Sequence, residues 1–435
     1  MLDHRDPLIA LADAIDWSFF HKEFAVFYAE EGRPAKRIRL MVGLLLLKQI
    51  ENLSDERVVL EWKRNPYYQY FCGMQEYVPA LPCHATELVK FRQRIGVEGV
   101  ELIFSQSVAL HGKAAEEPEV IVDTTVQEKH ITYPTDGKLA IRMIAHLHRI
   151  AKEEGIRLRR SFVREIKEHR INLRYFRHPK RSKKARASMK RLRTIVGVLI
   201  RELGRKLSEE RLMNYQEEFE LFEKVIAQQP KDKNKVYSLH EAHVYAIAKG
   251  KDRTKYEYGT KASIVMTQKS GIIVGVSAHE KNEHDSKTLE KALEHAATHR
   301  KTPIKKATGD RGYRGAREVG GVTICIPGTP KKSDTRYQKE KKRKRFRRRS
   351  AIEPVIGHLK ADHRLSRNYL KGFIGDEINL LLAAAAFNMK KWMNLFLALW
   401  ILFNMMLLIY ALRRIFHSRK ERYDALSLAL LRCMR

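Results

Sequence analysis

Apolar residues recur at helical spacing through the first part of the chain. Residues 40–47 form an apolar run, and Ser54 stands where an N-cap would precede the next apolar position, Val58. These signals predict two helices joined by residues 51–54, within a helical domain at 1–115. Such a pair is either a DNA-binding helix-turn-helix or an ordinary hairpin that packs or dimerises, and the pattern is compatible with both.

The pattern changes at residues 119–126, where β-branched residues predict a buried strand that carries Asp123. Residues 140–235 return to helical spacing and are dense in cations, while acidic residues thin out at 170–201. A solvated charged helix is the usual explanation of such a run. The loss of acids favours a surface that contacts a phosphate backbone instead. We therefore predict a basic helical insertion at 140–235 that divides a core whose first part is 116–139.

Strand and helix patterns alternate after the insertion. They predict a strand hairpin at 262–267 and 272–277, a helix at 285–299, a strand at 304–308, a short helix at 314–319 and a strand at 322–326. This order resembles the ribonuclease H-like fold. We predict an α/β protein with a mixed sheet flanked by helices, in which residues 236–391 complete the core and an apolar helical tail follows at 392–435.

Composition points to a polyanionic partner. The chain has 84 Lys+Arg against 51 Asp+Glu, a formal net charge of +33, and 44% hydrophobic residues. Such an excess of cations favours nucleic acid through counterion release, and the apolar content is sufficient for a folded core. The four cysteines have no paired spacing, and Cys83-His84 has no second pair to complete a zinc site. The N-terminus lacks a signal-peptide pattern, so we expect a cytoplasmic protein.

Three carboxylates fall at positions that the predicted fold can bring together. Asp123 lies on a strand, Asp310 follows another strand, and Glu353 lies between Arg349 and Lys360. Magnesium prefers oxygen ligands, and two ions about 3.5–4 Å apart support an in-line displacement at phosphorus. We predict a two-magnesium site in which Asp123 bridges the ions while Asp310 and Glu353 flank them.

The local structure around Glu353 has two readings. On a continuous helix, Arg349, Glu353 and Lys360 would share one face. Pro354 disfavours a helical residue before it, so the helix is expected to begin near Ser350, whose spacing to Glu353 fits a capping box. Residues before Ser350 would then precede the helix.

The same residues carry a family resemblance. The chain resembles the DDE transposases of bacterial insertion sequences, most of all the IS-five type, whose last motif reads Tyr-x-x-Arg-x-x-x-Glu-x-x-x-x-x-x-Lys. Here Phe346, Arg349, Glu353 and Lys360 occupy the four positions, so Phe346 departs from the motif by lacking a hydroxyl. Similar strings occur at 39–73, 248–259, 309–315 and 367–372.

The resemblance implies metal-dependent cleavage at the ends of the element, release of a 3′-hydroxyl and its attack on target DNA. Asp123, Asp310 and Glu353 would be catalytic and would bind two Mg²⁺ ions, for which Mn²⁺ can substitute. The protein would bind the terminal inverted repeats of the element and the target DNA, and would form at least a homodimer during the reaction. The cations expected to contact phosphate are Arg349, Lys360, Arg311, Arg348, Lys342 and Arg343.

Two other functions fit the sequence: a nuclease that only hydrolyses, and a DNA-binding regulator or decayed transposase. Residues 395–412 approach the length of a membrane span. Because the rest of the chain is typical of a DNA-binding protein, a packed or self-associating helix is favoured there over a membrane anchor. His240 and His243 are one residue too close for a zinc-binding helix and predict a loop or strand edge.

Overall fold

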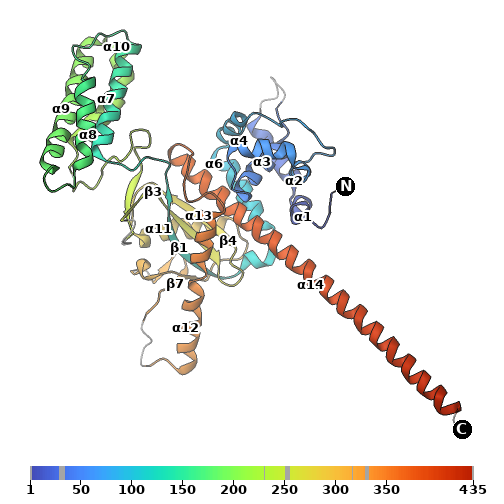
Figure 1. The fold of residues 1–435 in the computed structure, drawn as a ribbon. Coiled ribbons are helices and arrows are strands. Elements are labelled where there is room, and N and C mark those ends of the chain that lie inside the picture. The colour runs from blue at the N-terminus through green and yellow to red at the C-terminus, as the bar shows by residue number, and fades with distance from the viewer. Residues whose placement is uncertain are drawn as a thin grey trace.

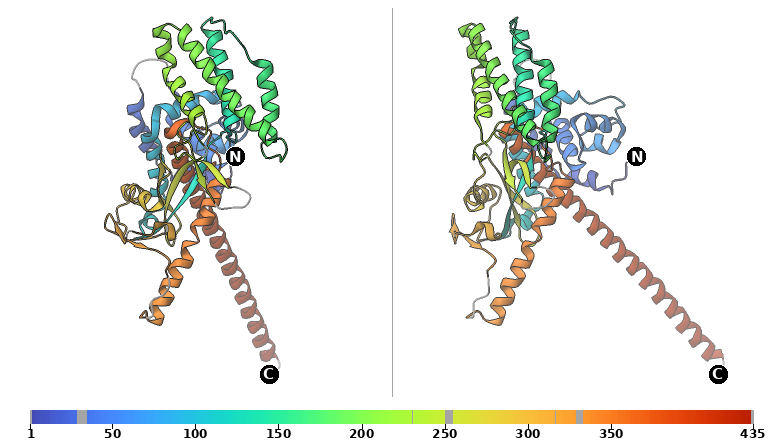
Figure 2. Two further views of the ribbon diagram at one scale, coloured as in Figure 1. Left: turned by 90° about the vertical axis from the view of Figure 1, so that its left-hand side faces the viewer. Right: turned by 60° about the vertical axis from the view of Figure 1, so that its left-hand side comes forward.

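The computed structural model describes residues 2–28, 35–229, 231–249, 255–315, 317–328 and 333–433, with side chains up to Tyr410. The structure consists of a helical N-terminal part, a mixed sheet flanked by helices, a separate helical bundle inserted between β1 (Glu119–Glu128) and β2 (Tyr245–Ala248), and one long C-terminal helix (Figure 1). The bundle and the end of the long helix extend away from the sheet in different directions (Figure 2). The chain is therefore mixed α/β, as predicted.

Helices fill the N-terminal part. They are α1 (Pro7–Ala14), α2 (Trp17–Phe24), η1 (Ala25–Phe27), α3 (Ile38–Ile50), α4 (Asp55–Arg64), α5 (Pro66–Phe71), α6 (Ala85–Ala109) and η2 (Gly112–Glu116). The Ser54 side chain accepts a hydrogen bond from the backbone N–H of Arg57 and caps α4, as its position predicts. Helix α3 is buried over nearly its whole length, including Lys48. Helix α3 is therefore the central helix of this part, and it has little exposed surface with which to bind a partner.

The sheet is built around β1 (Glu119–Glu128). Its order is β2-β3-β1-β5-β7-β6, and β4 also pairs with β3. Strand β3 pairs antiparallel with both β1 and β4, whereas β5 and β7 continue the sheet parallel to β1. The bounds are β2 (Tyr245–Ala248), β3 (Tyr256–Thr267), β4 (Ile273–His279), β5 (Lys306–Thr308), β6 (Glu318–Val319) and β7 (Val322–Cys325).

Three helices cover the sheet and complete the core. Helix α11 (Asp285–Thr298) packs on β3 and β4, α13 (Ile352–Ala361) packs on β1, and α14 (Gly372–Cys433) packs on β4, α3 and α6. Asn388 on α14 is buried and hydrogen bonds to both the N–H and the carbonyl of Ile273. The first third of α14 thus joins the sheet to the N-terminal helices.

Beyond Met393 the same helix leaves the protein body. Most apolar side chains between Leu395 and Tyr410 are exposed, with fractions from 39% for Leu397 to 69% for Met406, while Phe396 and Trp400 are half-buried. The stretch Gly372–Tyr410 is long and apolar enough to cross a membrane by length and composition, which is weak evidence for a span. A tail packed on its own chain is therefore wrong for these residues, while self-association stays a prediction. Ala411 and Leu412, which the prediction included, lie outside the described side chains.

The chain between β1 and β2 forms a helical bundle. It comprises α7 (Asp136–Glu153), α8 (Val163–Asn172), η3 (Leu173–Tyr175), α9 (Ser182–Lys206) and α10 (Glu209–Ala227), and stands apart from the sheet in Figure 1. Its buried apolar residues, among them Leu147, Leu199 and Phe222, form a hydrophobic core separate from that of the sheet. The bundle thus has its own source of stability.

Two local predictions are wrong. The described residues of the stretch 314–319 do not form a helix: η4 (Arg311–Tyr313) ends at Tyr313, Gly315 has φ +126°, and β6 begins at Glu318. A backbone at this φ breaks any helix and suits glycine. Ser350 does not form the predicted N-terminal capping box either, because it is the C-terminal cap of α12 (Arg336–Arg349), and α13 begins at Ile352.

Pro354 explains the second difference. It is the third residue of α13, in the first turn, where a backbone N–H has no helical partner and its absence costs little. Glu353 can therefore be helical beside this proline. Arg349 ends α12, whose capping box is formed by Thr335 and Gln338 instead.

Candidate active site

Asp123 lies in the middle of β1, opposite Ile264 of β3. Its side chain is 18% exposed and its Oδ1 accepts a hydrogen bond of 2.8 Å from the backbone N–H of Thr124. Ile121 of β1 is level with Thr308 of the parallel strand β5. Asp310 follows Thr308 by two residues, just as Asp123 follows Ile121, so the sheet places these two aspartates beside each other.

Asp310 is held by the turn that follows β5. Its Oδ1 accepts a hydrogen bond of 2.7 Å from the backbone N–H of Gly312, which opens η4. A Cβ added at Gly312 would lie 2.9 Å from Asp310 Oδ1 and 2.8 Å from Oδ2 of a third aspartate, Asp285. A larger residue at this position would therefore require these two carboxylates to move.

The sequence prediction missed Asp285. Asp285 is the first residue of α11. It accepts a hydrogen bond of 3.1 Å from the Thr124 hydroxyl and forms an ion pair of 3.0 Å with Lys261. Lys261 also donates to the carbonyl of Glu283. The signal in the sequence was an acid at a helix start, which is common and indicates no site by itself. The contacts of Asp285 with Lys261 of β3 and with Thr124 of β1 are visible only in the folded chain.

The pKa of Asp123 is raised within this cluster of acids. Burial is the main cause, and the negative charges of Asp310 and Asp285 add to it, while Arg349 and the Thr124 N–H oppose it; the result is a pKa of about 6. Burial and the same three carboxylates raise the pKa of the Tyr313 hydroxyl well above its ordinary value. A cation among these groups would relieve this crowding of negative charge.

Arg349 connects the cluster to Glu353. Its Nη1 lies 3.4 Å from Asp123 Oδ2, and its Nη2 lies 3.1 Å from Glu353 Oε1. Glu353 is 63% exposed, at the rim of the site. The structure thus brings Asp123 and Asp310 together directly, and joins Glu353 to them through a guanidinium group.

The other predicted phosphate ligands are dispersed. Lys360 lies 3.8 Å from Glu257 of β3, and Lys342 pairs with Asp334 at 2.7 Å. Arg348 donates to the carbonyl groups of the turn between β3 and β4, at Gln268 and Lys269. Two predicted cations are exposed, on η4 and on the outer face of α12: Arg311 and Arg343.

A second cluster lies between α6 and α11. Within the described parts of the chain, Glu101, His295 and His299 form the set of three possible metal ligands whose atoms all lie within 4.8 Å of one another. His295 Nδ1 accepts a hydrogen bond of 3.1 Å from the Val276 N–H, so its proton is on Nε2 and is donated to Glu101 at 2.8 Å. This tautomer cannot offer Nε2 to a metal, and the cluster is a hydrogen-bonded clamp between the two helices.

A buried ion network lies where the bundle joins the core. Lys129, just after β1, lies 2.6 Å from Asp376 of α14 and 3.5 Å from Glu241. His243 lies 3.1 Å from the other oxygen of Asp376. Residues 240–243 are a loop, as predicted. The network links the segment that leads from β1 into the bundle with the segment that returns from the bundle to β2.

Comparisons with known proteins identify two transposase domains in the chain. Residues 1–94 match the family model "Transposase domain (DUF772)", and residues 229–389 match "Transposase DDE domain". The chain is 42% identical over 184 residues to "Uncharacterized protein ORF8 in nfe locus" of Rhizobium meliloti, across 41% of this chain and 88% of that protein. No solved structure gives a significant match. The second family model spans Asp310, Glu353 and Asp285, whereas Asp123 lies outside both matched ranges.

Proposed function

The chain belongs to the DDE transposases of insertion sequences, and from this membership we propose that it cuts DNA at the ends of its element and transfers the freed 3′-hydroxyl strand into target DNA. The observation that carries the proposal is the placement of Asp123 on β1 and of Asp310 just after β5, the parallel strand beside β1. Two acids brought to the same level in this way can hold one cation between them. A DNA transposase acts on DNA, which accords with the net charge of +33.

The strand arrangement supports a ribonuclease H-like core. Three antiparallel strands, β4, β3 and β1, are followed by β5 and β7 parallel to β1, with α11 between the two groups. The bundle enters this core between β1 and β2. We propose that the domains are the N-terminal helices (1–115), the divided core (116–139 and 236–391), the insertion (140–235) and the tail (392–435).

DDE transposase domains generally use divalent metal ions, and the residues here fit such ions. Hard cations prefer carboxylate oxygens, and a bound cation would stabilise the charged form of Asp123, whose pKa is raised mainly by burial and further by Asp310 and Asp285. We propose that Asp123, Asp310 and Glu353 hold Mg²⁺, with Mn²⁺ able to replace it. When bound, the ions would make the attacking oxygen a better nucleophile and stabilise the leaving oxygen.

The surrounding residues prepare the site for that chemistry. Arg349 spans Asp123 and Glu353 with two N–H groups, and its planar guanidinium suits paired oxygens of a phosphate. Asp285 accepts from Thr124 and Lys261 and thereby fixes the strand beside Asp123. Phosphate contacts from Lys360, Arg311, Arg348, Lys342 and Arg343 stay predictions.

Transposases typically act in the cytoplasm, and the cellular partners proposed here follow from the reaction. They are the terminal inverted repeats of the element, the target DNA and a second copy of the chain, because two ends must be held together during transfer. Terminal repeats in the DNA that flanks the reading frame, bounded by a short target duplication, would support this; their absence would count against it.

A strand-joining assay tests the proposed reaction. A labelled duplex with a free 3′-hydroxyl at a pre-cut end is incubated with a supercoiled target and Mg²⁺, and joined products are resolved on a gel. We expect joining by the natural chain and its loss in Asp310→Asn, with DNA binding kept. Glu294→Gln, which removes an exposed carboxylate from α11, is the matched control. Cleaved but unjoined DNA would favour a hydrolytic nuclease, and binding without any reaction would favour a regulator or decayed enzyme.

A further inference from the structure

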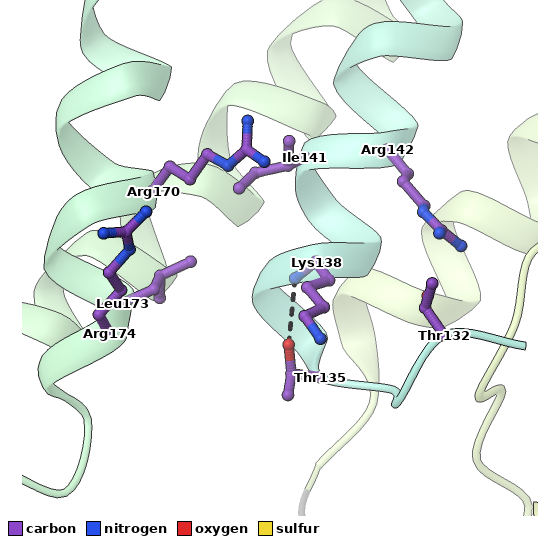
Figure 3. Close-up of a pocket in the computed structure, with 8 residues that line it drawn as sticks. All are labelled: Thr132, Thr135, Lys138, Ile141, Arg142, Arg170, Leu173 and Arg174. Atoms are coloured by element: carbon purple, nitrogen blue, oxygen red, sulfur yellow. Dashed lines mark hydrogen bonds between the residues drawn. The ribbon is translucent and has the colours of Figure 1, made fainter.

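A basic cleft lies at the base of the helical insertion, and none of the three carboxylates lines it. It has a volume of about 580 Å³ and lies where the linker from β1 meets α7, α8 and η3. Figure 3 shows Arg170 reaching from α8 toward α7, with Arg174 one turn below it. Its polar lining consists of Lys138, Arg142, Arg170, Arg174, Thr132 and Thr135.

The charge of this cleft is not neutralised by nearby acids. All four cationic side chains are exposed, and within the described parts of the chain none of them forms an ion pair. The two closest acids in sequence are engaged elsewhere. Asp136 pairs with Arg193 at 2.9 Å and Glu168 pairs with Lys184 at 3.5 Å. The cleft therefore presents four positive charges to solvent.

The cations are spaced along a helix rather than gathered around a point. Arg164, Lys167, Arg170 and Arg174 follow one another at intervals of three, three and four residues, so they lie on one side of α8 and η3. Such intervals correspond to about 4.5–6 Å along a helix, close to the separation of phosphates along a DNA strand. A small anion would need enclosed, converging donors, whereas an exposed row suits a polymer.

The start of α7 adds a further attraction for phosphate at the same place. Thr135 caps this 18-residue helix, with its hydroxyl accepting from the backbone N–H of Lys138 (Figure 3). The positive end of the helix therefore faces the cleft. The start of α7, the threonines of the linker and the arginines of the cleft therefore lie at one surface.

We propose that this cleft binds the phosphate backbone of duplex DNA, as a second contact beside the catalytic core. The identity of the duplex as the element's own end rests on the proposed function. The contact involves phosphates and carries no sequence information, so it grips element and unrelated DNA equally. Its role is to hold the duplex while the carboxylates act on the strand.

The test compares two triple variants of the full chain with the same loss of charge. The cleft variant is Arg142→Gln, Arg170→Gln, Arg174→Gln. The control is Lys152→Gln, Arg201→Gln, Arg205→Gln, which changes exposed cations near the other ends of α7 and α9. Binding to a labelled duplex is measured by fluorescence anisotropy between 50 and 300 mM salt, with element-end and scrambled sequences. Circular dichroism melting checks that both variants fold.

We expect the cleft variant to lose roughly ten-fold or more in affinity near 0.1 M salt, and its log–log salt slope to fall by about 2–3, because each phosphate contact contributes about 0.9. The control should change far less. Equal losses in the two variants would overturn the proposal, and so would a preference for anionic lipid vesicles over DNA.

The proposed reaction can fail independently of this cleft. If the cleft variant recovers strand joining at saturating DNA, the cleft contributes binding alone, as proposed. If the natural chain binds through the cleft but joins no ends, the reaction is wrong while the cleft stands. If joining proceeds normally and the cleft variant binds like the control, the cleft is wrong while the reaction stands.

Discussion

Arg349 Nη1 lies 3.4 Å from Asp123 Oδ2, and this contact couples the end of α12 to the central strand of the sheet. The same guanidinium lies 3.1 Å from Glu353. One side chain therefore sets the separation of two carboxylates that come from elements far apart in sequence. It also leaves a planar cation at the place where a phosphate would enter.

Arg349→Lys keeps the charge but loses the fork that reaches both carboxylates at once. We expect strand joining to slow on the order of 100-fold, as for loss of one preorganised donor, with DNA affinity within a few-fold of the natural chain. The comparison is single-turnover joining against anisotropy binding, with exposed Arg347→Lys as the control. Joining that keeps its rate would remove Arg349 from the mechanism.

Asp123→Asn removes a charge that burial and two neighbouring aspartates make costly. The pKa of Asp123 is raised to about 6, so at pH 7 the folded protein carries a destabilising charge that is absent below the unfolded value near pH 3.8. We expect the metal-free variant to be more stable by about 1–3 kcal/mol at pH 7, with less difference as pH falls through 6. Urea titrations with EDTA measure this.

Added Mg²⁺ should reverse that ranking. The natural chain gains stability from the ion in proportion to its affinity, whereas the variant has lost a proposed ligand. Identical stabilisation of the two proteins by Mg²⁺ would show that Asp123 does not bind the ion.

Asp285→Asn should leave the Lys261 ammonium, 11% exposed, with a backbone carbonyl as its remaining partner of those described. Loss of one member of a mostly buried pair costs about 1–3 kcal/mol, because the other charge stays desolvated. Lys261→Met added to Asp285→Asn should recover part of this. A double-mutant cycle in urea measures the coupling, and additive single effects would contradict it.

Glu101→Gln should weaken the clamp between α6 and α11 in a pH-dependent way. Burial alone would raise the pKa of Glu101, but hydrogen bonds from His295 and His299 outweigh it and lower the pKa to about 2. A depressed carboxyl pKa stabilises the fold above the unfolded value near 4.5, and this stability is lost as pH falls through 2. We expect a loss of about 2 kcal/mol at pH 6–7.

Thermal melts from pH 7 to pH 3 check this expectation. The gap between the natural chain and Glu101→Gln should narrow from about pH 4.5 downward. Glu98→Gln, on the same helix, serves as the control. A constant gap at every pH would mean that the clamp does not depend on the carboxylate charge.

Deletion of residues 395–435 should leave the fold intact, because the packed part of α14 ends at Met393. The deleted segment carries a continuous exposed apolar surface, which drives association in water. We expect the melting temperature to stay within about 2 °C and light scattering to fall. A carbonate-resistant membrane fraction of the full chain, absent for the deletion, would instead identify the tail as a membrane anchor.

The main elements could be predicted from sequence because strand and helix periodicities dominate there. The strand around Asp123 and the helix after Ser54 follow from β-branched runs and a cap. The placement of Asp285 could not be predicted, because it depends on how α11 lies across β3. One of the two readings of the sequence correctly placed Arg349 before the helix of Glu353, but the separate helix α12, which ends at Arg349, was not predicted.

The helical insertion is joined to the core by two segments of chain, and buried ion pairs of Lys129 with Glu241 and Asp376 hold these segments next to each other. Because the bundle has its own hydrophobic core, it is a separate structural module. Mutations in the bundle are therefore expected to leave the geometry of the carboxylates unchanged. If the proposed cleft contacts DNA, such mutations would alter the affinity for the phosphate backbone, whatever its sequence, without altering the chemistry.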